Sequence, residues 1–176
     1  LMAAATVGVF AGTLIVDLLT QGTPGAGFTL VGGGKLQVEG DFFAGPGSIE
    51  AGNLTWNTDA QLFAEVGHFG LLRGTGMVSS VEVHGGSIWP GSGASPGVLS
   101  VAGGTMYSGG YFKVDLDGPA VGTEYGQLAT GGLTLNPAAT LLDVELGFNP
   151  ALGQVFRIIS NEAGAVQGTF LELPEG

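Results

Sequence analysis

Glycine recurs at short, irregular intervals along the whole chain and separates short runs of apolar residues. There are 35 glycines in 176 residues, while 44% of the residues are hydrophobic. Disordered glycine-rich chains lack such apolar content, and collagen needs a strict Gly-X-Y period, which this sequence does not have. Because glycine adopts the positive φ angles of tight turns, the pattern predicts an all-β fold of many short strands joined by turns.

The strand-like runs share one form. Residues 34–40 (GKLQVEG) alternate polar and apolar side chains between two glycines, and residues 97–103 (GVLSVAG) and 132–135 (GLTL) follow a similar rhythm. Such alternation turns Leu and Val to one face of a strand. A loose repeat of this kind predicts coils that stack and bury their apolar faces on one another. We therefore expect a right-handed parallel β-helix, or β-solenoid.

The last third of the chain has longer strand-like runs, over residues 111–117, 140–146 and 154–159, with prolines in the links between them. The last coil of a solenoid leaves an unpaired strand edge that invites aggregation, so a solenoid needs a cap. We expect residues 1–104 to form the coils and residues 105–176 to form a C-terminal β-sheet cap that is continuous with them.

The charge balance excludes several partners. The chain carries 15 acidic residues against four lysines and arginines, for a net charge of -11. Four scattered cations cannot form a phosphate-binding surface, so we expect neither nucleic acid nor an anionic membrane as a partner. The chain has no cysteine, which excludes disulfides and thiolate metal sites.

Residues 1–19 form the most apolar segment. They lack the basic start of a signal peptide and contain Asp17, while Gly8, Gly12 and several β-branched residues disfavour a helix. The composition favours strands over a short helix, which stays an open alternative, and no membrane insertion is expected. The segment is poorly protected by charge, so we expect it to add as a strand to a neighbouring copy, through Val7, Val9, Phe10, Leu14, Ile15 and Val16.

Carboxylates supply the strongest candidate for a bound ion. Asp115 and Asp117 alternate across Leu116 and therefore share one face of a strand. Such a pair could bind Ca²⁺ or act as acid and base. A solvated strand face beside a turn is the competing interpretation, and it is favoured because no EF-hand loop or calcium-binding nonapeptide is present. We expect no resident cofactor and no dedicated metal site.

Other chemistry-bearing residues are sparse. His68 and His84 are the only histidines and lie about one coil apart, so they could stack, but a metal site would still need a carboxylate such as Glu65 or Glu82. No G-x-S-x-G motif surrounds a serine. The aromatic residues could form a platform for sugars, although packing in the core or at coil ends is the simpler interpretation: Trp56, Trp89, Tyr107, Tyr111 and Tyr125.

A series of motifs runs through the second half of the chain. Residues 72–101 read LRGTGMVSSVEVHGGSIWPGSGASPGVLSV, and GTEYGQL (122–128), TLLDVELGF (140–148) and GTF (168–170) follow in that order. Over residues 72–176 this order resembles bacterial autotransporter-type β-helix passengers. It is also similar to related exported β-strand-repeat proteins, some of which end in a PEP-CTERM sorting tail.

The resemblance implies export, a β-helical fold and a role at a bacterial cell surface or in an extracellular matrix. It implies no shared catalytic residue. Gly126 stands where the family motif usually has Asp, and the 176 residues contain neither a translocator barrel nor a sorting tail. We therefore expect the chain to be part of a longer product.

These features predict an extracellular structural protein that is not an enzyme. It would form or decorate a surface fibre, sheath, adhesin or matrix, and it would self-associate into a homopolymer through exposed strand edges. The main alternative is a β-helix that binds or cleaves surface glycans. The scarcity of Arg and Lys argues against cleavage, because polysaccharide lyases need cations to stabilise a charged intermediate. A third reading is a spike, which would be a tight homotrimer.

Overall fold

The computed structural model describes residues 5–16, 28–38, 46–58, 62–136 and 139–173. These residues form fourteen strands and no helix, as the glycine and strand pattern predicts. The strands are β1 (Ala5–Gly8), β2 (Thr13–Val16), β3 (Phe28–Val31), β4 (Lys35–Val38), β5 (Pro46–Trp56), β6 (Phe63–Gly74), β7 (Met77–Val78), β8 (Ser80–Val83), β9 (Ser87–Pro90), β10 (Val98–Tyr107), β11 (Gly110–Leu116), β12 (Gln127–Leu135), β13 (Thr140–Leu146) and β14 (Ile159–Asn161).

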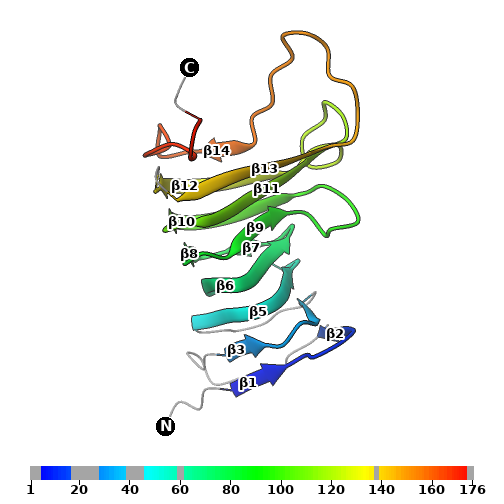
Figure 1. Cartoon of the computed structure of the whole chain (residues 1–176), viewed down its shortest axis with the longest axis vertical. Helices are drawn as coiled ribbons and strands as arrows, with labels where there is room; N and C mark the ends of the chain where they lie inside the picture. The colour runs from blue at the N-terminus through cyan, green and yellow to red at the C-terminus, as the bar shows by residue number, and fades with distance from the viewer. Residues whose placement is uncertain (1–4, 17–27, 39–45, 59–61, 137–138, 174–176) are drawn as a thin grey trace.

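The strands stack along the long axis of the molecule in parallel register (Figure 1). Every pairing between these named strands is parallel. The sheet does not close into a barrel, because its strand order runs from β1 at one end to β14 at the other. No helix long and apolar enough to cross a membrane occurs in the described part of the chain.

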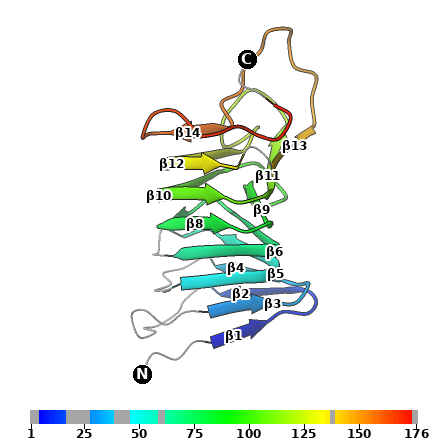
Figure 2. The same ribbon diagram turned by 60° about the vertical axis from the view of Figure 1, so that its left-hand side comes forward.

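The register sorts the strands into three columns. The first holds β1, β3, the first halves of β5 and β6, β8 and the second halves of β10 and β12. The second holds β2, β4, the second halves of β5 and β6, β9, β11 and β13. The third holds β7, the first halves of β10 and β12, and β14. One pass of the chain through the columns is called a coil below; Figure 2 shows β1, β3, β5, β6 and β8 stacked above one another.

The core consists of apolar rows that run up the inside of each column. In the second column Leu36, Leu54, Leu72, Ile88 and Phe112 are register partners from one coil to the next, and all five are buried. The alternating burial of each strand follows from its alternating sequence, because successive side chains point to opposite faces. Each fully buried Leu, Ile or Phe stabilises the fold by about 1.5–3 kcal/mol.

The strand predicted over residues 154–159 is wrong except for its last residue, because only β14 (Ile159–Asn161) forms there. Phe156 and Ile158 pack against the core, whereas Leu152 and Val155 are exposed. The alternation of apolar residues in this part of the sequence therefore reflects side chains of a loop that point alternately toward the core and toward solvent. Such alternation does not require a neighbouring strand. The expected boundary at residue 104 falls inside β10, so the sheet continues across it.

Candidate functional site

The outward face of the second column carries most of the chemistry-bearing side chains. In β11 Phe112, Val114 and Leu116 point into the core, which turns Lys113 and Asp115 outward. Register pairs Lys113 with Asp143 and Asp115 with Glu145 on β13, and Arg73 of β6 with Trp89 of β9. The parallel register thus brings residues from four coils onto one surface.

Trp89 lies at the centre of this surface. Its indole Nε1 donates a hydrogen bond of 2.9 Å to Asp115 Oδ2, and the Arg73 guanidinium carbon lies 4.2 Å from the centroid of its ring. Lys113 Nζ lies 5.8 Å from the same centroid and forms a 2.5 Å ion pair with Asp143. Two of the four cations of the chain are therefore held against Trp89, where the planar guanidinium of Arg73 suits stacking on an aromatic ring.

Asp115 is the most perturbed carboxyl group of the described residues. Burial raises its pKa, the hydrogen bond from Trp89 lowers it, and the nearby carboxylates of Glu145 and Asp117 raise it further. Burial also lowers the pKa of Arg73, against the attraction of Asp115. A carboxyl group whose pKa is raised by burial and by neighbouring carboxylates is a pattern found at acid–base and ligand sites.

A groove of about 260 Å³ opens beside these carboxylates. Asp115, Asp117 and Glu145 line the groove together with Trp89 and the loop 93–96. The two calcium candidates, Asp115 and Asp117, do share this surface. Within the described ranges, however, no three or more His, Cys, Asp or Glu gather closely enough to hold a metal ion. Ca²⁺ binding at this pair stays the less favoured alternative to a solvated strand face.

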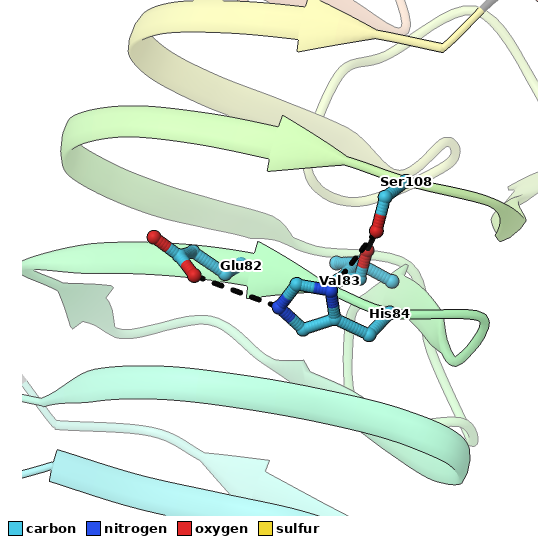
Figure 3. A network of polar contacts seen from close by, with 4 residues as sticks. All are labelled: Glu82, Val83, His84 and Ser108. Carbon is cyan, nitrogen blue, oxygen red and sulfur yellow. Dashed lines mark hydrogen bonds and ion pairs between the residues drawn. The ribbon is translucent and has the colours of Figure 1, made fainter.

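The histidines lie at a corner of the coils and do not form a pair of metal ligands in the described part of the molecule. His84 Nδ1 lies 3.0 Å from Ser108 Oγ, and His84 Nε2 lies 3.5 Å from Glu82 Oε2 (Figure 3). Ser108 Oγ donates its own proton to the carbonyl of Val83, at 2.9 Å, so it accepts from His84. His84 consequently does not act as a base toward Ser108, and the group is a polar link between coils.

The aromatic residues do not form a single platform among the described side chains. Trp56 is fully buried and Tyr125 lies in the core, where Tyr125 packs edge-on against Phe156. Trp89 is partly covered by Arg73, and Tyr111 is exposed on the same outward face. The side chain of Tyr107 lies outside the described residues. Core packing accounts for Trp56 and Tyr125.

The residues predicted to mediate assembly lie in and between β1 and β2. Val9 is buried, Phe10 is 80% exposed and Leu14 is 46% exposed. The backbone positions of Val7, Ile15 and Val16 lie in these strands, while their side chains lie outside the described ones. β1 pairs with β3 and β2 pairs with β4, so in the described structure one edge of each strand carries no partner strand.

Comparison with known proteins found no matching family model and no match among curated proteins. The resemblance of residues 72–176 to exported β-helix passengers therefore stays a prediction.

Proposed function

We propose that this chain is a right-handed parallel β-helix that forms or decorates the surface of a bacterial cell as part of a fibre, sheath, adhesin or matrix. Its role is mechanical, and it assembles with further copies through strand edges. The observation that carries the proposal is a parallel stack in which one edge of β1 and one edge of β2 have no partner strand among the described residues. The right hand follows the strong general preference of crossovers between parallel strands.

Several properties support this function over an enzymatic one. Apolar rows and backbone ladders join the coils along the whole described length, which suits a load-bearing element. The acidic composition and the absence of cysteine suit an exported repeat protein. The Ser108 hydroxyl, the one serine in contact with a histidine among the described residues, donates to a carbonyl and is not activated as a nucleophile.

Removal of residues 1–19 tests the proposal. The truncation deletes β1 and β2 and leaves β3 (Phe28–Val31) and β4 (Lys35–Val38) on the new edge, where Lys35 of β4 opposes strand addition. We expect the full chain to form filaments in negative-stain micrographs and the truncated chain to stay monomeric. Filaments that persist after truncation, with unchanged abundance, would contradict assembly through this segment.

A second candidate function, glycan binding, is favoured by the groove beside Trp89. Carboxylates of Asp115, Asp117 and Glu145 can accept hydrogen bonds from sugar hydroxyls, and Arg73 and Lys113 lie on the same surface. A glycan array combined with a lyase assay on acidic polysaccharides tests it, with Asp115→Asn as the variant. Binding that the variant weakens supports this function, and an array without signal for the parent protein rejects it.

A further inference from the structure

The last strand of the second column exposes residues that belong to the core row. Val144 and Leu146 of β13 are 43% and 54% exposed, whereas their register partners Val114 and Leu116 of β11 are 1% and 9% exposed. The four side chains occupy the same inward rows, so the difference comes from position in the stack. In the described structure β13 has a coil below it and no strand paired above it.

The C-terminal segment covers only the beginning of β13. Leu171 N donates a 2.7 Å hydrogen bond to Thr140 O, and Phe170 stacks on Phe112 with ring centroids 6.1 Å apart. The loop between β13 and β14 arches above the far end of β13 before it returns to β14 (Figure 1). The edge of β13 beyond Thr140 therefore has no strand partner among the described residues.

The opposite end of the second column has the complementary form. Leu14 of β2 is 46% exposed, whereas its register partner Leu36 is 6% exposed. Leu14 starts the same inward row that continues through Leu54 and ends at Leu142, the partner of Phe112. The row therefore ends at both sides in a leucine on a strand with one free edge in the described structure. The free edge of β2, which carries Leu14, faces one way along the axis, and that of β13, which carries Leu142, faces the opposite way.

We infer that the β13 edge is the acceptor for β2 of a second copy, in parallel register, with Leu14 of one copy against Leu142 of the next. This inference rests on the proposed function and names its interface. The pairing extends the column with the same strand direction and the same inward row. Because the two surfaces differ, the contact is heterologous and propagates into an open filament.

The composition of both edges supports this pairing. Proteins that prevent edge association place lysine, proline or bulges on their edge strands. β2 reads TLIV and β13 reads TLLDVEL, so neither contains lysine or proline. Of the two acids on β13, Asp143 is paired with Lys113, which leaves Glu145 as the main charge that opposes a neighbouring acidic copy.

Two substitutions of the full chain test the inference. Leu14→Lys blocks the donor end and Val144→Lys blocks the acceptor end. Phe69→Lys is the matched control, because Phe69 is 77% exposed on β6, in the middle of the stack and away from both end strands. In sedimentation velocity we expect each blocked variant alone to be monomeric and an equimolar mixture to form dimers, since each variant keeps one functional end. The control should form filaments like the parent chain.

A disulfide test covers the case in which a lysine variant fails to fold. The chain has no cysteine, and paired positions on neighbouring strands lie within disulfide reach. The double variant Leu14→Cys with Leu142→Cys should give a ladder of covalent oligomers on oxidation, while Leu14→Cys with Phe69→Cys should not, because Phe69 lies on β6 in the middle of the stack. Equal ladders from both, or filaments from Val144→Lys, would overturn the acceptor assignment while leaving assembly intact. A parent chain that never assembles would instead reject the proposed function itself.

Discussion

Gly110 shows how single residues set the coil geometry. It is the first residue of β11, at a corner of the coil, with φ of 86°, and a Cβ atom built there would meet Gly86 O at 1.9 Å. Gly153 has a similar φ of 83° in the loop after β13, and a Cβ atom there meets nothing within 4 Å. Gly110 is thus required for two reasons, the positive φ and the close approach of the coil below. Gly153 is favoured for the positive φ alone.

This contrast predicts two different costs for the same substitution. Gly110→Ala should lower the free energy of unfolding by about 2–4 kcal/mol, because strain and a backbone clash add. Gly153→Ala should lower it by only about 1–2 kcal/mol, because it introduces the unfavourable φ alone. Urea denaturation of both variants measures the difference. Equal losses would show that the close contact with Gly86 O is not a determinant of stability.

Asp115 gives a pH-dependent prediction. Its pKa is raised in the folded protein, so the folded state binds more protons than the unfolded state at pH values between the unfolded and folded pKa. Stability from this group is therefore retained below the unfolded pKa and is lost as the pH rises through the folded pKa. Asp115→Asn should raise the urea midpoint near neutral pH and have little effect well below the ordinary carboxyl pKa. A stabilisation of equal size at both pH values would exclude this ionisation as the cause.

At the scale of elements, burial separates the inner coils from the last one. Phe112 is fully buried on β11, one coil before the end of the inward row, whereas Leu146 is 54% exposed on β13. Phe112→Ala should reduce the free energy of unfolding by about 3–5 kcal/mol, since it leaves a large cavity. Leu146→Ala should cost less than about 1 kcal/mol. Thermal unfolding of the two variants measures this, and a similar loss for both would contradict the assignment of β13 as an uncovered strand.

The sequence predicts some elements well and others poorly, for a physical reason. The run at residues 140–146 has the same bounds as β13, and the alternating run at residues 34–40 contains β4. Both alternate polar and apolar residues between turn signals. The run at 154–158 shows the same alternation without a neighbouring strand edge, and alternation alone cannot reveal whether a partner exists.

The surface around Trp89 was predicted only in part for a related reason. Asp115 and Asp117 are visible in the sequence because they lie on one strand, two residues apart. Arg73, Trp89 and Glu145 join them from other coils, and the coils differ in length, as the partners Val66, Val83 and Tyr107 show. Without the register of each coil, residues from different coils cannot be placed on one surface.

At the scale of the whole molecule, charge opposes the association that the open edges favour. Each copy carries a net charge of -11, so neighbouring copies repel one another at low ionic strength. Salt screens exposed charges over about 10 Å at 0.1 M. We therefore expect the critical concentration for assembly to fall as sodium chloride is added, by light scattering. A critical concentration that rises with salt would indicate an interface held by opposite charges and would contradict an apolar strand contact.

Negative-stain microscopy of the 176-residue chain at moderate salt tests the central claim most directly, because it shows whether stacks join end to end. We predict unbranched filaments with the width of a single stack, whose length increases with protein concentration. Separate particles of one stack length at every concentration and salt level would contradict a self-assembling structural protein.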